Sequence, residues 1–213
     1  MIAVPKLIAV GFLSIGIFVL MQVILPVISF QMWAIGQNYR SQNLVSPTKS
    51  NKDVLGVSIQ NRDSFPAFVS SVKREAEPNY DSFSLSIPKL KIAKEEVLVD
   101  TNDLSKGLAH LPGSSLPGEK GNIFISGHSA LSQLFSLKSV PFSKLSDLKK
   151  GDQIILETSG AKFTYEVLDF KIVNPSDLSV LQAPDNRGRY VSLMTCVPPG
   201  LNFKRLVVLG KMI

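Results

Sequence analysis

The beginning of the chain contains an apolar stretch that separates it from the rest of the sequence. No charged residue occurs from Leu7 to Tyr39, and residues 7–30 are interrupted only by Ser14, Gln22, Pro26 and Ser29. A helix of about 20 apolar residues crosses the hydrocarbon core of a bilayer. The stretch therefore predicts a transmembrane helix, followed by a polypeptide that folds in water.

Two kinds of segment have this composition, a cleaved signal peptide and an uncleaved signal anchor. A signal peptide has an apolar region of about 7–15 residues and ends at a small-residue cleavage site. The stretch in this chain is longer, and no A-x-A-like site follows it. We therefore expect residues 1–35 to form a short cytoplasmic segment and a single-pass anchor in the cell membrane.

The orientation of this anchor does not follow from the flanking charges. Lys6 precedes the stretch and Arg40 follows it, so the positive-inside rule favours neither direction. Long C-terminal domains are translocated largely regardless of charge. We therefore expect a cytoplasmic N-terminus and an extracytoplasmic remainder.

Residues 36–79 are rich in serine, asparagine, glutamine, lysine and aspartate. They predict an extracytoplasmic stalk that holds the following domain away from the bilayer. Segment 54–72 carries scattered apolar residues, but Pro66 prevents a single helix through it. A short helix packed on the surface of the domain is the most structure that we expect in this segment.

From Tyr80 onward the pattern predicts short strands. Phe83, Leu85 and Ile87 alternate with serines, which is the period of a half-buried strand. A helix is expected over Val140–Lys149, where apolar residues recur at i, i+3 and i+6. Further strands are predicted over Glu96–Val99, Asn122–Ser126, Gln153–Glu157, Lys162–Val173, Tyr190–Thr195 and Leu206–Lys211. Seven or eight short strands with few helices indicate an all-β domain, either a closed barrel or a sandwich.

The charge of the chain does not indicate a nucleic-acid partner. The formal net charge is +6, and residues 80–213 hold 16 Lys and Arg against 13 Asp and Glu. This excess forms no dense basic stripe, and aromatic residues are not interleaved with it. One cysteine and two separated histidines also fall short of a zinc site, so we expect neither a metal nor another cofactor.

Cys196 is the only cysteine of the chain. Without an intramolecular disulfide partner it is an inert buried thiol, an intermolecular link or a nucleophile. If the strands around it are antiparallel neighbours, Cys196 leaves one strand where Arg205 enters the next. A guanidinium there favours the thiolate and can bind an oxyanion or a carbonyl, although Arg205 is also compatible with an ordinary surface position.

A nucleophilic cysteine needs a partner for proton transfer, which is usually histidine. His128 follows a predicted strand, and Gly127 before it leaves room for a close approach. His110 lies in a loop rich in proline and glycine. Lone histidines are more often structural than catalytic, and of the two we favour His128.

The succession SIPKLKI, GLAHLPGSSLPGEKGNIFISGH, YVSLMTC and KRLVVLG resembles the sortase family of surface-anchoring cysteine transpeptidases. The resemblance covers residues 83–213. It implies a closed eight-stranded β-barrel with short helices as the catalytic domain, over residues 80–213. In the family pattern, serine at position 192 replaces a threonine before the cysteine and keeps its hydroxyl group.

The resemblance also implies the roles of four residues. Cys196 matches the nucleophile, His128 the general acid and base, and Arg205 the residue that stabilises the oxyanion. Thr195, beside the cysteine, matches a substrate-binding position. No metal ligand is implied.

The implied reaction is transpeptidation of surface-protein precursors. Cys196 attacks the threonine carbonyl of a C-terminal sorting signal of the Leu-Pro-x-Thr-Gly (LPxTG) type and forms a thioester. An amine acceptor, such as a lipid-linked cell-wall precursor or a pilin lysine, then resolves this thioester. The short segment 174–189 and the absence of an Asp-Pro-aromatic motif favour a housekeeping-like or related general-anchoring type.

Two other functions fit the same residues. A membrane-anchored barrel could bind ligands without turnover, because fold similarity does not guarantee activity. A cysteine hydrolase could use water in place of the amine. The reactivity of Cys196 and the products formed with and without an amine would separate these possibilities.

Overall fold

A computed structural model describes residues 11–22, 57–62, 65–70, 78–129, 140–199 and 203–213, with isolated positions between 24 and 32. The chain divides into two compact units, Met1–Pro47 and Thr48–Ile213. Each unit is described by itself.

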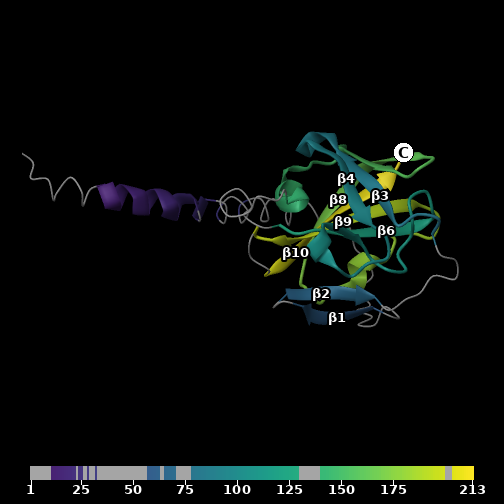
Figure 1. Ribbon diagram of the computed structural model, residues 1–213, viewed down its shortest axis with the longest axis horizontal. Helices are drawn as coiled ribbons and strands as arrows, with labels where there is room; N and C mark the ends of the chain where they lie inside the picture. Colours follow the sequence, from purple (N-terminus) through teal and green to yellow (C-terminus); the bar gives the residue numbers. More distant parts are fainter. Residues whose placement is uncertain are drawn as a thin grey trace, which may run out of the picture. The chain divides into compact units, whose positions relative to one another are not determined.

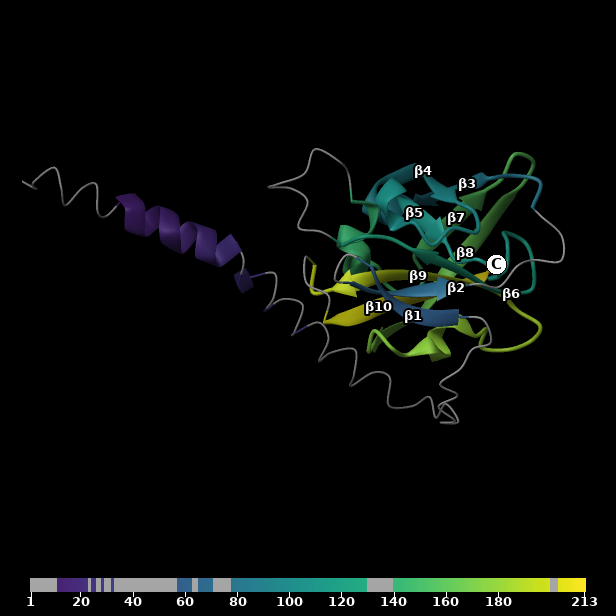
Figure 2. The same ribbon diagram turned by 60° about the horizontal axis from the view of Figure 1, so that its bottom comes forward.

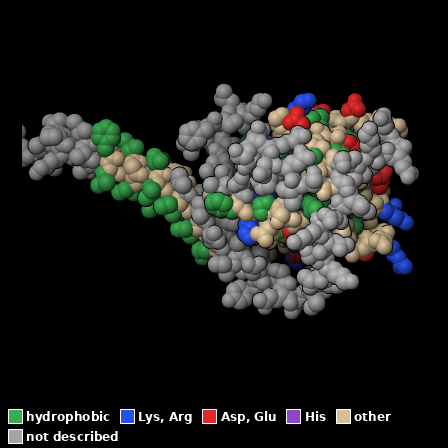
Figure 3. Space-filling view, turned by 90° about the horizontal axis from the view of Figure 1, so that it is seen from below, with side chains coloured by type: hydrophobic (Ala, Val, Ile, Leu, Met, Phe, Trp, Pro, Cys, Tyr) green, Lys and Arg blue, Asp and Glu red, His purple; other side chains and the backbone are tan. Residues whose placement is uncertain are grey.

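The first unit contains a helix over residues 11–22. Its large apolar side chains are exposed, and the exposed fraction of Phe12 is 73%. Figure 3 shows these side chains in green along the helix. No helix within the described residues is both long enough and apolar enough to cross a membrane. Much of the predicted span lies outside the described residues, so the transmembrane anchor stays a prediction.

The second unit is built on a closed barrel of eight strands (Figure 1). Neighbouring strands around it follow the order β10-β8-β7-β3-β4-β5-β6-β9. Two pairs, β4 with β5 and β6 with β9, are parallel, and the other pairs are antiparallel. The strands are β3 (Ser82–Ile87), β4 (Ile92–Leu98), β5 (Leu108–His110), β6 (Gly121–Ser126), β7 (Gln153–Glu157), β8 (Lys162–Val173), β9 (Arg189–Val197) and β10 (Lys204–Met212).

The burial of the strands follows their sequence patterns. The side chains of β3 alternate between buried and partly buried positions, as the serine alternation predicts. In β9, every residue from Tyr190 to Thr195 is buried. A strand covered on both faces reads as a nearly continuous apolar run. Along its two edges, β9 forms hydrogen bonds with β6 and with β10. This central strand carries Cys196 near its end.

The predicted all-β class and the eight-stranded barrel are confirmed, and closure of the strand order excludes the sandwich. The strands at Gln153–Glu157 and Lys162–Val173 have the predicted bounds. β5 was not predicted from the pattern, because three residues are too few to show a period of two.

The helical stretch expected around Val140–Lys149 is confirmed, in 3₁₀ form. The structure forms a 3₁₀ helix, η4 (Pro141–Asp147), with a kink at Lys144. Apolar residues at i, i+3 and i+6 fit three residues per turn better than 3.6, and Phe142 and Leu145 are buried. The other short 3₁₀ helices are η2 (Pro88–Leu90), η3 (Leu104–Lys106) and η5 (Leu178–Leu181).

The short helix expected within segment 54–72 is wrong. The chain forms an antiparallel hairpin there, with β1 (Val57–Arg62) paired to β2 (Phe65–Ser70). Pro66 breaks a helix but is tolerated in an edge strand, where no ladder partner needs its missing N–H. Figure 2 shows β2 beside the strands that carry the site residues, and Phe68 packs against the barrel there.

Candidate active site

Cys196 and Arg205 are directly opposite each other on antiparallel neighbours. The register of β9 and β10 pairs Cys196 with Arg205 and Thr195 with Leu206. The expected placement at one end of the sheet is therefore what the structure shows. Segment VPPGLNF connects the two strands, as the sequence predicts.

His128 reaches the same end through the parallel pairing of β6 with β9. Ser126 pairs with Met194, and the next residue, Gly127, donates its N–H to the Met194 carbonyl at 3.0 Å. His128 follows directly and is exposed. The three residues singled out by the sequence therefore meet, although they come from three strand ends.

These residues line one pocket. Its walls are mostly apolar, which is usual for a site that binds an organic ligand or a peptide. The lining residues are Phe68, Thr101, Asn102, Leu104, Ala109, Leu111, Ser126, Gly127, His128, Met194, Thr195, Cys196 and Arg205.

Gly127 is required by close packing. A Cβ atom built there would lie 2.6 Å from Leu108 Cδ2 and 2.6 Å from Phe142 Cδ2. Both of these side chains are buried, so they cannot move aside without disturbing the core. The sequence predicts that Gly127 allows a close approach before His128. In the structure, side chains of the barrel core make that approach, in the space that a Cβ atom would need.

Burial and charge act in opposite directions on Cys196. Burial raises the pKa of the Cys196 thiol above its ordinary value, and the positive charge of Arg205 opposes this shift without cancelling it. The guanidinium group belongs to a residue that is only 2% exposed, and Nη1 donates to the Lys204 carbonyl at 3.2 Å. The resting thiol is therefore mainly protonated at neutral pH and needs a base.

Thr195 lines the pocket, and its hydroxyl group is engaged within the protein. Oγ1 donates to the Gly127 carbonyl at 2.9 Å, and the residue is buried. This bond ties the strand of the cysteine to the turn that carries His128. The structure thus gives Thr195 a positioning contact beside the pocket.

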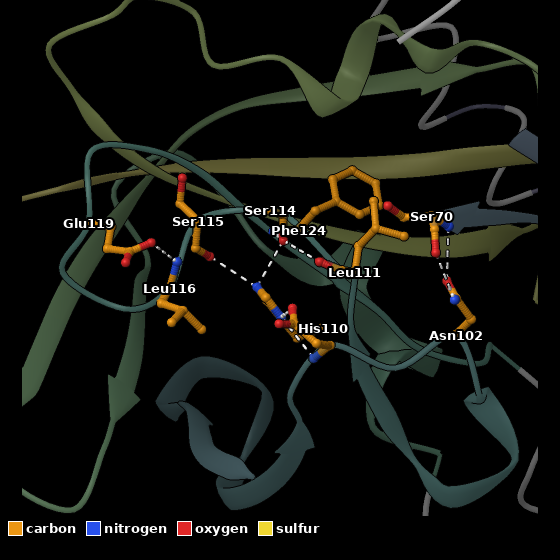
Figure 4. A network of polar contacts seen from close by, with 10 residues as sticks. Ser70, Asn102, His110, Leu111, Ser114, Ser115, Leu116, Glu119 and Phe124 are labelled. Carbon is orange, nitrogen blue, oxygen red and sulfur yellow. Dashed lines mark hydrogen bonds and ion pairs between the residues drawn. The ribbon is translucent and has the colours of Figure 1, made fainter. Parts of the chain in front are cut away.

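His110 lies in the core and does not line the pocket. Its Nδ1 accepts from the Asp100 N–H at 3.2 Å. Its Nε2 lies 2.8 Å from Ser114 Oγ and 3.0 Å from the Ser115 carbonyl (Figure 4). Asp100 Oδ1 also lies 3.2 Å from Nδ1. His110 therefore holds the loop between β5 and β6.

A buried asparagine fixes the loop between β8 and β9. Asn122 Nδ2 donates to the carbonyls of Leu181 at 3.1 Å and Val180 at 3.4 Å, and Oδ1 accepts from Ser192 Oγ at 3.0 Å. These bonds hold η5, so that Leu178 and Val180 pack beside Met194. The hydroxyl group that serine keeps at position 192 therefore helps to hold Asn122 in place.

The far end of the same loop is held by Asp185. Its carboxylate accepts from the Arg187 and Gly188 N–H groups and from the Tyr190 hydroxyl at 2.5 Å. These bonds lower the pKa of Asp185 to about 2, and the bond to the carboxylate raises the pKa of Tyr190 to about 12. The loop is therefore fixed at both ends.

The sequence analysis did not find the other lining residues, and two of them come from segments for which it predicted no strand or site. Phe68 belongs to β2, and Asn102 lies between β4 and η3. No local motif marks either residue, because their role depends on how the hairpin lies against the barrel. Within the described residues, no group of three or more His, Cys, Asp or Glu side chains could hold a metal ion.

A family model for the sortase domain matches residues 85–213. The chain belongs to the sortase family. The match covers the barrel strands from within β3 onward and includes all four residues implied by the sequence resemblance. The proposed identification of the family is confirmed.

Individual sortases show the same relationship. The chain is 34% identical to sortase D of Bacillus subtilis over 131 residues, which are 60% of this chain and 61% of that protein. It is 33% identical to sortase A of Bacillus anthracis over 132 residues, 62% of this chain and 56% of that protein. The matches thus span about three-fifths of these relatives.

Solved sortase structures share the fold at similar identity. The pilus-related sortase C of Group B Streptococcus aligns with a TM-score of 0.56 and 32% identity, covering 64% of this chain and 69% of that one. Sortase C-1 from Actinomyces oris aligns with a TM-score of 0.55 and 31% identity, covering 62% and 72%.

Proposed function

We propose that the protein is a cysteine transpeptidase that uses Cys196, His128 and Arg205. The observation that carries the proposal is the cross-strand pairing of Cys196 with Arg205 in a pocket that His128 also lines. Membership of the sortase family supports the same chemistry. An inert core thiol would not require a buried arginine as its cross-strand partner.

The first step is acylation of Cys196. His128 takes the proton of the thiol, and the thiolate attacks a peptide carbonyl to form a tetrahedral oxyanion. The Arg205 guanidinium stabilises the negative charge on that oxygen. His128 then returns the proton to the departing amine, and a thioester remains on Cys196. The second step reverses these proton movements when an acceptor amine attacks the thioester.

The substrate that we propose is an LPxTG-like signal at the C-terminus of a surface-protein precursor. The apolar lining of the pocket, which includes Leu104, Leu111 and Met194, fits the leucine and proline of such a signal. The acceptor in this proposal is an amine of a lipid-linked cell-wall precursor or a pilin lysine. One solved relative is described as pilus-related.

We further propose that the chain is anchored in the cell membrane with the barrel outside the cell. The support is the exposed apolar helix over residues 11–22 and the uncharged stretch around it. Fractionation of expressing cells tests this proposal, because the protein should stay with membranes after washing with carbonate. Recovery in the soluble fraction would contradict it.

The activity is tested with an LPxTG-like peptide library and an amine acceptor. Mass spectrometry should detect a ligated product and an acyl adduct on Cys196. The variant Cys196→Ala should form neither and should keep the circular dichroism spectrum of the wild-type protein.

Other outcomes identify the alternatives. Cleavage with water as the only acceptor would indicate a hydrolase. A folded protein with reduced Cys196 that forms no adduct with any peptide would indicate a binding module or a different signal.

A further inference from the structure

One wall of the active-site pocket is formed by the connection between β4 and β5. This connection covers residues 99–107 and includes η3. β5 pairs with β4 over only two positions, so the sheet ladder does not hold the connection itself. Three residues of the connection line the pocket: Thr101, Asn102 and Leu104.

The beginning of the β4–β5 connection is held by His110, the last residue of β5. The ring Nδ1 accepts from the Asp100 N–H at 3.2 Å, and the His110 carbonyl accepts from the Thr101 N–H at 3.0 Å. Asp100 has a φ of 48°, in the left-handed region that aspartate adopts more readily than most residues. Two successive N–H groups of this turn are therefore bound by one residue.

The opposite side of the His110 ring is tied to the next loop and to β6. Nε2 lies 2.8 Å from Ser114 Oγ and 3.0 Å from the Ser115 carbonyl (Figure 4). Ser114 Oγ donates to the Leu111 carbonyl at 2.8 Å and accepts from the Phe124 N–H at 3.2 Å. The ring therefore joins the β4–β5 connection to β6, the strand that leads to the candidate base.

His110 itself does not contact the pocket. Its side chain is fully buried, and its ring packs edge-on against Phe83 with the ring centroids 6.0 Å apart. Asp100, His110 and Ser114 are the residue types of a nucleophilic triad, but none of the three lines the pocket. His110 can therefore influence the reaction only through the residues that it holds.

We propose that His110 is a positioning residue for the substrate-binding wall of the pocket. Its Nδ1 and its carbonyl fix the turn that places Thr101, Asn102 and Leu104 along the wall. Its Nε2 fixes the ring, and with it the wall, to β6. The identity of the bound peptide rests on the proposed function, whereas the positioning contacts do not.

Two substitutions separate the contributions of the two ring nitrogens. His110→Asn places an amide near the position of Nδ1, where its oxygen can accept from the Asp100 N–H. His110→Gln places an amide near the position of Nε2, where it can bond to Ser114 or Ser115. The second variant leaves the Asp100 N–H without this acceptor, so only the first should preserve the wall.

Steady-state kinetics with a cleavable LPxTG-like peptide measure the effect. KM of His110→Gln should be at least about tenfold above the wild-type value, because the wall then holds the binding conformation about a tenth of the time. KM of His110→Asn should stay within about threefold of the wild-type value. The turnover number should change less than KM in His110→Gln, because the substitution does not touch His128, Cys196 or Arg205. Equal KM values in the three proteins would overturn the inference.

Leu156→Ala is the matched control for lost stability. Leu156 is fully buried in β7 and does not line the pocket, so its truncation destabilises the core without touching the wall. At a temperature at which circular dichroism shows every variant folded, Leu156→Ala should keep the wild-type KM. A KM as high as that of His110→Gln would show that KM follows stability alone and would reject the inference.

Hydrogen exchange of the full-length wild-type protein in detergent micelles requires neither a variant nor a substrate. The Asp100 and Thr101 amides should be protected nearly as strongly as the amides of β6, because His110 holds them against the barrel. The Ser105 amide belongs to the same connection, but its hydrogen bond is exposed, so it should exchange faster. Exchange of the Asp100 and Thr101 amides as fast as that of Ser105 would show that His110 does not hold the wall.

The same measurements distinguish this inference from the proposed function. Loss of Asp100 protection in His110→Gln but not in His110→Asn, without turnover of any peptide, would keep His110 as the residue that holds the wall and reject the proposed reaction. Transpeptidation by His110→Gln with the wild-type KM would keep the reaction and reject the positioning role.

Discussion

At the scale of single residues, the site combines a buried thiol with a buried positive charge. Burial destabilises the thiolate of Cys196, whereas Arg205 stabilises it, and burial has the larger effect on the thiol pKa. The protein therefore does not store a reactive thiolate. In the proposed reaction, His128 removes the proton from this neutral thiol.

The pH dependence of Cys196 alkylation tests this balance. The rate should rise through a midpoint above the ordinary thiol pKa, because the reactive thiolate forms only above the raised pKa. Replacement of the charge in Arg205→Gln should move the midpoint further upward. Lys150→Gln removes an equal charge from an exposed side chain that pairs with Asp169 and should leave the midpoint in place. A downward shift in Arg205→Gln would contradict the assignment.

The Thr195 hydroxyl supports a second prediction. Thr195→Val keeps the shape of the side chain but removes the donor to the Gly127 carbonyl. A buried carbonyl without its donor costs about 1–3 kcal/mol, and the turn before His128 loses its tie to β9. The turnover number should fall more than KM changes. Thr195→Ser should restore most of the turnover, and a serine variant as slow as the valine variant would reject the positioning role.

At the scale of elements, the loop between β8 and β9 is fixed by polar contacts at both ends. At one end, Asn122 accepts a hydrogen bond from Ser192 and donates to η5. At the other end, Asp185 accepts a hydrogen bond from Tyr190 of β9. The loop can therefore present Leu178 and Val180 in a defined position beside the pocket.

Loss of the Asn122 contacts should affect substrate binding. Asn122→Leu removes both donor bonds to η5 and the acceptor for Ser192, so the loop should become mobile. KM for the peptide should increase several-fold while the turnover number changes less, because His128 and Cys196 are not touched. Steady-state kinetics with a cleavable peptide measure both constants. A fall in turnover at constant KM would show that the loop supports the chemistry instead.

The elements also show what the sequence could predict. Strands with clear alternation or long apolar runs, such as β3, β7 and β8, were predicted within a residue or two. The placement of Cys196 near Arg205 followed from the expected antiparallel strands, whereas the parallel pairing of β6 with β9 that brings His128 to the same end was not predicted. The hairpin and the roles of Phe68 and Asn102 could not be predicted, because they arise from docking between segments that carry no shared local pattern.

At the scale of the whole molecule, closure of the barrel links the site to global stability. β9 lies between β6 and β10, and these three strands or the turns beside them supply His128, Cys196 and Arg205. These three residues therefore have no support that is independent of the barrel. Their arrangement should form and disappear together with the fold.

Leu193→Ala tests this coupling. Leu193 is fully buried in β9, and removal of such a side chain costs about 2–5 kcal/mol of the free energy of unfolding. Circular dichroism and the protection of Cys196 from alkylation should be lost at the same denaturant concentration, which is lower than in the wild type. Loss of thiol protection well before the loss of circular dichroism would show that the site unfolds separately.

The position of the hairpin in the chain has a consequence for timing. Ribosomes add about 5–20 residues per second, so Ser70 is made on the order of ten seconds before Arg205. β1 and β2 pair with each other and with no barrel strand, but an isolated hairpin is marginally stable, and the surface on which Phe68 packs includes Met194 and Val207, which are made later. Phe68 therefore takes its place in the wall of the pocket only when the barrel strands are present, although it is synthesised long before Cys196.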